Sequence, residues 1–454
     1  MNPPVTAKPA RWSSERSAMN HEGTSGWGGL PSPQTAAPVD LSERWIGLDV
    51  ARGVALLGIL MVNIHYFALP SGIFADTAPP DGSSAFSVVA WYAYRFFCET
   101  KFYPLFSLLF GVGLAIQFIR ARERGQRWWG APVRRLLALL CIGVAHALLV
   151  WFGDILFVYS IIGFAMVFLV RLRARGLAIT ACVLAVIVLL IAVLPALGTA
   201  FGSSSFPTAK VPIVLDDRPP VTQLLAGLGD RHLMGPWEAG YRELETRALR
   251  DGPFAQAMGV RAITWMIAAF FLILTGGAQI LMLFCLGAAM LKAGWLKPDA
   301  ARVQWRMVAV GLAVGLPAAL VEILTGPHHT DWLAVFANTA LASLGVPFLS
   351  MAYLGLALRW ANSGSLAWLA HRVSLVGRMG LTNYLMCSLL GAFIFQHWGL
   401  ARFGSLSTAQ LLGVALGIYA VVLVFSSLWL STFRFGPMER LWRSATYGRW
   451  NVSA

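Results

Sequence analysis

The stretch from residue 44 to residue 67, RWIGLDVARGVALLGILMVNIHYF, is the first long apolar run of the chain and decides its fold class. A helix of about 20 apolar residues spans the hydrocarbon core of a bilayer. Four polar residues nevertheless interrupt this run, namely Asp49, Arg52, Asn63 and His65. Such groups are costly inside a membrane, so they usually face a partner, a cavity or a substrate. We therefore expect a membrane-spanning helix whose polar residues have a specific role.

The polar residues of this first helix are predicted to form a stripe. Asp49 and Arg52 are three residues apart and so share a helix face. Asn63 lies about three turns, or roughly 16 Å, beyond Arg52 and falls on the same face. The stripe would then extend nearly from one membrane surface to the other, and the remaining helices would pack around it.

The composition of the whole chain predicts an all-α, polytopic transmembrane helical bundle. Of its 454 residues, 57% are hydrophobic and only 12% are charged, whereas soluble domains contain about 25% charged residues. The net charge is +14. Most basic residues stand in short clusters beside apolar runs, where they set topology and contact anionic lipid. This placement argues against nucleic acid as a partner and for the lipid bilayer.

Ten spans are predicted, at about 45–68, 102–119, 134–152, 155–171, 177–199, 264–292, 306–324, 332–358, 378–398 and 408–432. The aromatic segment 85–98 is expected to lie at the outer interface or to be half inserted. If it crossed the membrane, the arginine cluster after residue 119 would lie outside, against the positive-inside rule. The same rule places both termini in the cytoplasm.

The chain divides into four regions by composition. These are a disordered cytoplasmic tail, an N-terminal membrane half, an extracytoplasmic loop and a C-terminal membrane half, at 1–43, 44–199, 200–261 and 262–450. The tail is rich in Pro, Ser, Gly and Ala. It contains no apolar core followed by a small-residue cleavage site, so we interpret it as disordered and not as a signal peptide.

No metal site is expected. The five cysteines are scattered and form no CxxC pair. His328 and His329 are near Asp331, but adjacent residues do not share a helix face, so their spacing suits a metal poorly.

One candidate catalytic pair lies in HALLVWFGDILFVY, residues 146–159. His146 falls in the outer half of one span and Asp154 at the start of the next. A general base and its orienting partner need such an imidazole and carboxylate close together. The alternatives are a packed core histidine and an aspartate that caps a helix. His65 is either part of an interfacial aromatic belt or a second acid or base facing the same cavity as His146.

Other polar residues are candidates for binding. Arg52 could hold the phosphates of an acyl carrier, because the planar guanidinium binds phosphate bidentately; the alternative is a structural ion pair with Asp49. Lys101 either pairs with Glu99 at the surface or faces the cavity.

Two further motifs lie near the C-terminus. GRMGLTNYLMCSLL, residues 377–390, contains Arg378 and Asn383, which could join helices or line a substrate path. FGPMERLWRSATYGRW, residues 435–450, is expected to form an amphipathic helix at the cytoplasmic interface.

Five motifs follow one another along the chain: LDVARGVALLGILMVNI, KFYPLFSLLFGVGLAIQ, HALLVWFGDIL, GRMGLTNYL and FGPMERLWRSATY. Together they resemble the YeiB-like bacterial inner-membrane family, whose C-terminal part is a domain of unknown function. The resemblance covers about residues 44–447. Each motif is weak alone, but five in family order are specific. The resemblance implies a multi-pass protein of the bacterial inner membrane.

The first helices of that family are similar to the heparan-glucosaminide acetyltransferase group and, more distantly, to the integral-membrane acyltransferases. The shared feature is an Arg-Gly pair with a polar residue eleven positions after the arginine. That residue is histidine in the integral-membrane acyltransferases and Asn63 here. The loop 68–84 also lacks the histidine that the glucosaminide enzymes carry after their first helix. His146 and Asp154 are therefore the expected catalytic pair.

The resemblance and the residues together predict an integral-membrane acyltransferase. It would move an acyl group from cytoplasmic acyl-CoA, with acetyl-CoA as the expected donor, to an extracytoplasmic or lipid-linked acceptor such as a lipid or glycan. The catalytic candidates are His146, Asp154 and His65. The donor-binding candidates are Arg52, Asp49 and Asn63, and the substrate-binding candidates are Lys101, Arg378 and Asn383. The alternatives are a transporter or permease for a small anionic or lipidic solute, and a membrane protein without enzymatic activity.

Overall fold

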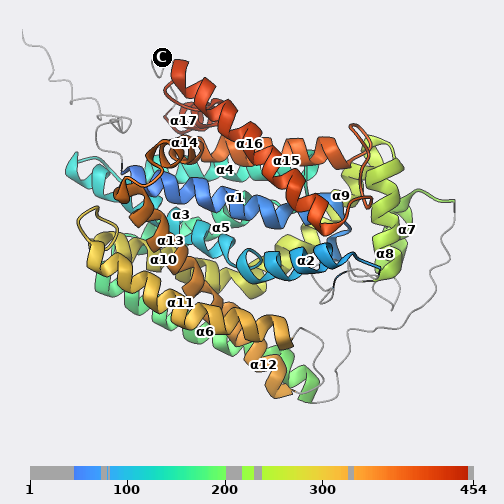
Figure 1. Ribbon diagram of the computed structural model, residues 1–454, viewed down its shortest axis with the longest axis horizontal. Coiled ribbons are helices and arrows are strands. Elements are labelled where there is room, and N and C mark those ends of the chain that lie inside the picture. The colour runs from blue at the N-terminus through green and yellow to red at the C-terminus, as the bar shows by residue number, and fades with distance from the viewer. Residues whose placement is uncertain are drawn as a thin grey trace, which may run out of the picture. The chain divides into compact units, whose positions relative to one another are not determined.

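The computed structural model describes residues 45–72, 79, 82–200, 217–229, 238–325 and 332–447. Within these ranges every regular element is a helix (Figure 1), which confirms the all-α fold. The described helices belong to one compact unit. The predicted tail, 1–43, lies outside the described residues, as do His328, His329 and Asp331.

Seventeen α-helices and three short π-helical segments make up the described chain. The α-helices are α1 Ile46–Ala68, α2 Ala85–Phe97, α3 Phe102–Glu123, α4 Gly130–Leu149, α5 Leu156–Leu169, α6 Ala174–Ala200, α7 Pro220–Gly229, α8 Ala239–Thr246, α9 Phe254–Phe271, α10 Gly277–Lys292, α11 Ala301–Thr325, α12 Trp332–Ala340, α13 Val346–Ser363, α14 Ala367–Arg378, α15 Gly380–Phe395, α16 Thr408–Thr432 and α17 Pro437–Tyr447. The π-helical segments are η3 Arg247–Asp251, η4 Leu272–Gly276 and η5 Leu341–Gly345.

The number of full-length spans differs from the prediction of ten. Among the described residues, eight helical stretches are long and apolar enough to cross a bilayer, and nine if the bent pair α14 and α15 counts as one span. The expected span that is missing from this set, 155–171, corresponds to α5, which has only 14 residues. At 1.5 Å per residue it covers about 21 Å, less than the roughly 30 Å of a hydrocarbon core. By length and composition the described residues thus give eight or nine full spans and one shorter apolar helix, where the sequence predicted ten spans.

The segment 85–98, expected to lie at the outer interface or to be half inserted, is a helix of its own that ends at a short break, residues 98–101, before α3. It forms α2, and α2 and α3 together make one helical stretch, Ala85–Glu123, of 39 residues. That length corresponds to about 58 Å, roughly twice the thickness of a hydrocarbon core. One part of this stretch must therefore extend beyond the core.

The first helix is the centre around which both halves of the sequence pack. Figure 1 shows α1 running through the middle of the bundle. Its neighbours are α3 from the N-terminal half and α13 to α16 from the C-terminal half. The contact with α14 is close, because a Cβ added to Gly377 would lie 1.9 Å from the carbonyl oxygen of Asp49. Only glycine allows the two backbones to approach in this way.

A sharp bend separates α14 from α15, and the C-terminal helix packs against it. The two helices meet at 86°, which frees the first backbone N–H groups of α15. Glu439 of α17 accepts from two of them, those of Leu381 at 2.8 Å and Thr382 at 3.1 Å. The indole of Trp442 donates to the carbonyl oxygen of Arg135 at the start of α4. The expected amphipathic helix is therefore formed, but these side chains face the protein and not the membrane surface.

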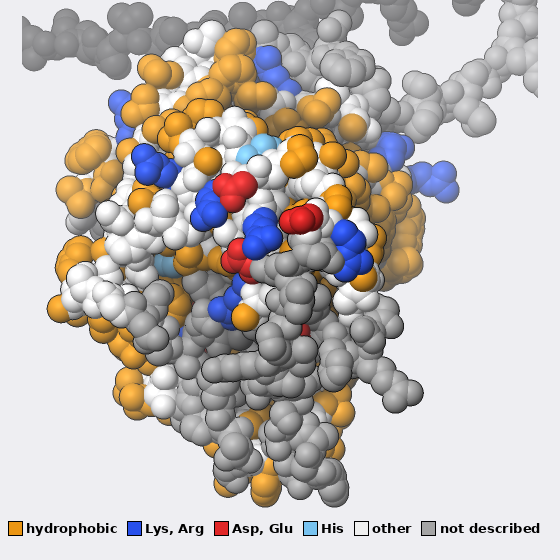
Figure 2. Space-filling model, turned by 90° about the vertical axis from the view of Figure 1, so that its right-hand side faces the viewer, with side chains coloured by type: hydrophobic (Ala, Val, Ile, Leu, Met, Phe, Trp, Pro, Cys, Tyr) orange, Lys and Arg blue, Asp and Glu red, His pale blue; other side chains and the backbone are white. Residues whose placement is uncertain are grey.

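The opposite end of the bundle carries short helices with charges of both signs. Figure 2 shows basic and acidic side chains close together on this face. They include the ion pairs Arg247–Glu243 in α8 and η3, at 3.0 Å, and Arg250–Asp251, also at 3.0 Å. All four side chains are exposed, so we expect these pairs to add little stability.

Candidate functional site

The predicted contact between His146 and Asp154 is present. His146 Nδ1 lies 2.8 Å from Asp154 Oδ2, and the two residues are only 4% and 5% exposed. Asp154 Oδ1 accepts from the backbone N–H of Phe157, also at 2.8 Å. An ionised carboxylate only accepts, so a proton on His146 Nδ1 suits this contact, and in the neutral form of that tautomer Nε2 has the free lone pair. Asp154 thus combines the two alternatives left open by the sequence, a helix cap and a partner for histidine.

The local chain explains why these two residues meet. The helix α4 ends at Leu149, and α5 begins seven residues later at Leu156. The tight connection folds α5 back against α4, where Gly143 leaves room: a Cβ there would lie 2.7 Å from Asp154 Oδ1. The short spacing of histidine and aspartate in the sequence thus becomes a side-by-side arrangement at one end of the bundle.

The other ring nitrogen of His146 is available for chemistry. His146 Nε2 is buried and makes no hydrogen bond to the described residues. The ring centroids of His146 and Tyr384 are 5.3 Å apart. The hydroxyl of Tyr384 is also buried; it has no side-chain partner among the described residues and faces the backbone N–H of Ile155. A buried polar atom without a partner is costly, so this pair of atoms marks a place where a polar group from outside would be stabilised.

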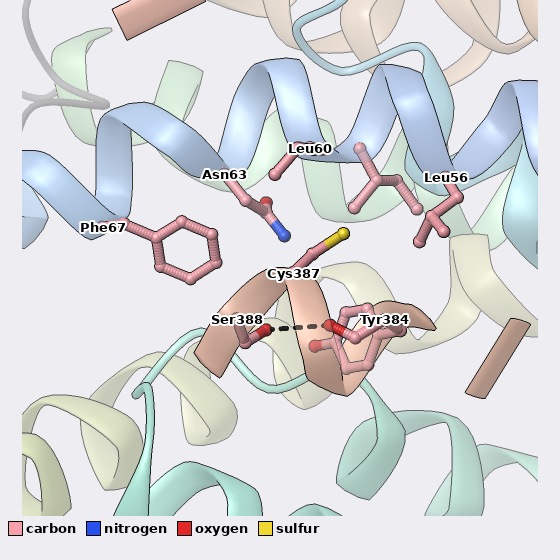
Figure 3. Close-up of a pocket in the computed structure, with 8 residues that line it drawn as sticks. Leu56, Leu60, Asn63, Phe67, Tyr384, Cys387 and Ser388 are labelled. Atoms are coloured by element: carbon pink, nitrogen blue, oxygen red, sulfur yellow. Dashed lines mark hydrogen bonds between the residues drawn. The ribbon is translucent and has the colours of Figure 1, made fainter. Parts of the chain in front are cut away.

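A small cavity lies between α1 and α15, on the side of Tyr384 (Figure 3). It is lined by Leu56, Ile59, Leu60, Asn63, Phe67, Tyr384, Cys387 and Ser388. About 10 Å³ is open to the centre of a water molecule, which is room for roughly one water. Figure 3 shows the amide of Asn63 directed toward this space from α1. Tyr384 therefore links the cavity with the His146 ring.

Tyr384 was missed by the sequence analysis, which chose its neighbour Asn383. Consecutive helical residues point about 100° apart, and here Tyr384 lines the cavity while Asn383 does not. Asn383 is fully buried and donates to the Ser426 hydroxyl at 2.8 Å and the Val376 carbonyl at 3.0 Å. It joins α15 to α16 and does not line the cavity. The sequence contained a signal for Tyr384, because Cys387 and Ser388, which also line the cavity, follow it by one helical turn.

The other end of the polar stripe holds the expected ion pair. Arg52 Nη1 lies 2.7 Å from Asp49 Oδ1. Asp49 is buried, whereas the Arg52 side chain remains 28% exposed. The pair and Asn63 thus lie on the same helix, about 16 Å apart along its axis.

His65 does not face the cavity that contains Asn63. Its imidazole is stacked on the ring of Tyr94 in α2, with a centroid distance of 4.0 Å, and its Nδ1 lies 3.2 Å from the Met61 carbonyl oxygen. The residue is 1% exposed. His65 and Asn63 are two positions apart and so point to different sides of α1. The expectation that His65 shares a cavity with His146 is therefore not met.

Lys101 has neither of the two surroundings that the sequence suggested. Its ammonium is 1% exposed and lies 3.1 Å from Glu322 Oε2 in α11. Glu99 pairs instead with Arg95, at 2.8 Å. Lys101 also donates to the Arg95 carbonyl oxygen, so it belongs to a buried cluster between α2, α3 and α11. It does not line the Asn63 cavity, and nor does Arg378, whose Nη2 is 3.5 Å from the Arg434 carbonyl oxygen.

Arg261 is a second residue that the sequence analysis did not select. We had placed it at the end of the extracytoplasmic loop, yet it lies in α9 and is 1% exposed. Its Nη1 donates to Gln396 Oε1 at 2.6 Å and to the Val150 carbonyl oxygen at 3.3 Å. The available signal was a single cation inside the apolar run that begins at Phe254. Across the described ranges, no cluster of three or more His, Cys, Asp or Glu side chains is arranged to hold a metal.

Comparison with known proteins identifies relatives along nearly the full chain. A family model described as a protein of unknown function (DUF418) matches residues 290–449. The uncharacterized protein YxaH of Bacillus subtilis is 30% identical over 424 residues, covering 92% of this chain and 98% of YxaH. The uncharacterized protein YeiB of Escherichia coli is 30% identical over 416 residues, covering 89% and 96%. An uncharacterized 39.9 kDa protein of Bacillus acidopullulyticus is 28% identical over 418 residues, covering 91% and 96%.

Proposed function

The chain belongs to the YeiB-like family of membrane proteins, and from its site we propose that it is an integral-membrane acyltransferase. The donor is an acyl-CoA on the cytoplasmic side, with acetyl-CoA as the first candidate. The acceptor is a hydroxyl or amine of an extracytoplasmic or lipid-linked molecule. The observation that carries this proposal is the buried 2.8 Å contact between His146 and Asp154, with His146 Nε2 free beside Tyr384.

The pair supplies a general base. Asp154 holds the Nδ1 proton and so fixes the tautomer in which Nε2 can accept. His146 Nε2 takes the proton of the acceptor hydroxyl or amine while the acceptor forms a bond to the thioester carbonyl carbon. The carbon–sulfur bond then breaks, and His146 returns the proton to the leaving thiolate. The imidazole ends the cycle neutral, so one base serves both steps.

Two donors beside the base are suited to the developing oxyanion. The Tyr384 hydroxyl donates to no acceptor in the described chain, and the Asn63 amide points toward the cavity that Tyr384 lines. Donors that are already in place stabilise negative charge in the transition state without reorganisation. The cavity has room for about one water, so α1 and α15 must separate to admit substrate. Asn63 acts here as a hydrogen-bond donor to the oxyanion, a role that suits a side chain unable to act as a base.

Arg52 is proposed to bind the phosphates of the donor. It lies in the first two turns of α1, held by Asp49 and partly exposed. A planar guanidinium suits phosphate groups. The stripe from Arg52 to Asn63 then lies along the path between the donor phosphates and the reacting carbonyl.

The experiment is acyl transfer by purified protein in vesicles. We expect transfer from radiolabelled acetyl-CoA into the lipid or glycan fraction of added bacterial membranes, and loss of it in His146→Ala. His65→Ala serves as the matched control, because that buried histidine lies outside the proposed site. Transfer that continues unchanged in a folded His146→Ala protein would falsify the proposal.

A transporter is the second candidate, favoured by one observation. The 86° bend between α14 and α15 is a broken helix packed against α1, and broken helices form substrate sites in many transporters. The freed N–H groups of α15 are, however, already bonded to Glu439. Uptake of an anionic or lipidic solute into proteoliposomes without acyl-CoA would favour this alternative.

A further inference from the structure

Arg261 has an unusual environment for a buried cation. Its side chain is enclosed by protein, and no acidic side chain among the described residues pairs with it. Its hydrogen bonds to the neutral Gln396 and to the Val150 carbonyl oxygen are both donated by Nη1. Arg261 Nε and Nη2 are buried and make no hydrogen bond in the described chain, and the only other contact of the charge there is with the Phe254 ring, whose centroid is 5.2 Å from Arg261 Cζ. Buried charges are normally paired because an uncompensated one is strongly unfavourable.

The unpartnered nitrogens of Arg261 have a defined geometry. Nε and Nη2 lie on the same edge of the guanidinium, and their two N–H bonds are parallel. This edge matches two oxygens of one oxyanion, which it binds bidentately. Gln396 is 2% exposed and its Oε1 also accepts from the Trp398 indole at 3.2 Å. It therefore holds the guanidinium in place, so that the free edge is already oriented.

The Arg261 side chain lies beside the proposed base. Arg261 contacts the carbonyl oxygen of Val150. Val150 is four residues after His146, or about 6 Å further along the axis of α4. One turn after Arg261 on α9, Trp265 packs on Phe157, with ring centroids 5.0 Å apart. Phe157 in turn donates its backbone N–H to Asp154. The helix α9 thus packs against the end of α4 and the start of α5, the two elements that carry His146 and Asp154.

The depth of Arg261 favours phosphate as the oxyanion. The residue lies about 10 Å from the start of α9, inside the candidate span Phe254–Lys292. That stretch of 39 residues is about 58 Å long against roughly 30 Å of hydrocarbon core, so a core centred on it would begin about 14 Å from its start, close to the level of Arg261. Other unpartnered buried nitrogens on this end of the bundle, Trp265 Nε1 and His397 Nδ1, add further polar groups without a described partner.

We propose that the free edge of Arg261 binds a phosphate group of the acceptor. The hydroxyl or amine of the acceptor that is acylated lies a short distance from that phosphate. The acceptor is then a phosphate-bearing molecule, either membrane-embedded or soluble. The identification of this ligand as the acceptor rests on the proposed acyl transfer. Phosphate binding at Arg261 does not, because it is measurable without any reaction.

The experiment measures binding of dodecyl phosphate to the full chain in a neutral detergent, by thermal midpoint and tryptophan fluorescence. We expect a saturable rise in the midpoint with wild-type protein and at least a tenfold weaker affinity in Arg261→Gln. Arg261→Lys, which keeps the charge but not the fork, should bind with intermediate affinity. The matched control Arg247→Gln, an exposed arginine of the same end, should bind like wild type. If Arg261→Gln does not fold, Arg261→Lys against wild type decides the question.

Competition then identifies the source of the phosphate. Displacement of dodecyl phosphate by millimolar inorganic phosphate indicates that the anion alone is recognised, and no displacement indicates that the lipid chain is needed. The inference is overturned if wild type, Arg261→Gln and Arg261→Lys bind dodecyl phosphate equally, or if wild type binds it no better than dodecyl glucoside. His146→Ala separates the two proposals, because it should lose acetyl transfer but still bind dodecyl phosphate. If all proteins, wild type included, bind dodecyl phosphate but none transfers acetyl groups, the phosphate site stands and the acyltransferase proposal is rejected.

Discussion

His146 Nδ1 and Asp154 Oδ2 lie 2.8 Å apart, although the turn between two antiparallel helices separates the residues in sequence. Replacing Asp154 with Asn should therefore disturb the base more than the fold. We expect the rate of acyl transfer to fall by about 100- to 10,000-fold, the range typical of losing a positioned proton-transfer group. The measurement is the initial rate in vesicles, with the exposed Asp251→Asn as control. An Asp154→Asn protein with an unchanged rate would show that the pair is structural.

Tyr384 should matter for activity more than for stability. Tyr384→Phe removes one buried hydroxyl that has no side-chain partner among the described residues, so the thermal midpoint should change little. The loss of an oxyanion donor should lower the rate by about 10- to 1,000-fold. Its neighbour provides the contrast: Asn383→Ala breaks the bonds to Ser426 and Val376 and should lower the midpoint. A Tyr384→Phe protein that is destabilised but fully active would contradict this assignment.

The Lys101–Glu322 pair is buried and should be costly to break. Lys101→Met leaves the Glu322 carboxylate without its ammonium, which we expect to reduce the free energy of unfolding by about 3–5 kcal/mol. The double variant Lys101→Met/Glu322→Leu should recover most of this loss, since no unpaired charge remains. Denaturation in detergent measures both effects. The exposed pair offers the control, because Arg247→Met should cost less than about 1 kcal/mol. Equal losses for the single and the double variant would argue against an electrostatic cause.

Glu439 caps a helix of the membrane bundle from the C-terminal helix. Its carboxylate accepts from the backbone of Leu381 and Thr382 and from the Thr382 hydroxyl. Removal of these acceptors in Glu439→Ala should cost about 0.5–2 kcal/mol, as for other helix caps. We expect faster proteolysis after α16 as well, because α17 loses a main attachment. Glu243→Ala, at an exposed position, should change neither the midpoint nor the cleavage rate.

Glu245 should make stability depend on pH. Burial raises the pKa of this carboxyl group to about 7, while the N–H and hydroxyl of Ser71 donate to it at 2.8 and 2.9 Å. Because the folded state then binds the proton more tightly, the contribution of Glu245 is fully present below its unfolded pKa. It is lost as the pH rises through about 7.

The check on Glu245 is the thermal midpoint between pH 5 and pH 8. We expect Glu245→Gln to flatten the decline seen with wild type, since its amide oxygen still accepts from Ser71 but does not titrate. The two profiles should diverge most at the upper end of this range. Parallel profiles would mean that another group titrates.

The sequence predicted the fold class well because burial in lipid imposes a simple pattern. Long apolar runs of about 20 residues have few alternatives to a membrane helix, and most of the expected spans are present. The exceptions are informative. The chain from 155 to 171 is as apolar as its neighbours but forms only the 14 residues of α5, because part of it is used in the turn from α4. The segment 85–98 forms α2, which a short break at residues 98–101 separates from α3, and the two still make one helical stretch; hydropathy does not predict the angle at such a break.

The pairs of polar residues that are close in sequence were also predictable. Asp49 and Arg52 share a helix face by their spacing alone, and they form the 2.7 Å ion pair. His146 and Asp154 stand on either side of one tight turn, so their contact required only a local fold.

Partners that are distant in sequence depended on tertiary structure. Lys101 pairs with Glu322, 221 residues away, and Tyr384 meets both the His146 ring and the Asn63 cavity. Neither follows from a local pattern, since the distance between two helices depends on which faces pack. By itself the sequence determined an all-α membrane bundle with a polar first helix. Only the packing of α15 and α9 against α1 and α4 decided which buried donors lack an acceptor, because hydrogen bonds between helices satisfy some donors and leave the Tyr384 hydroxyl and one edge of Arg261 without an acceptor in the described chain.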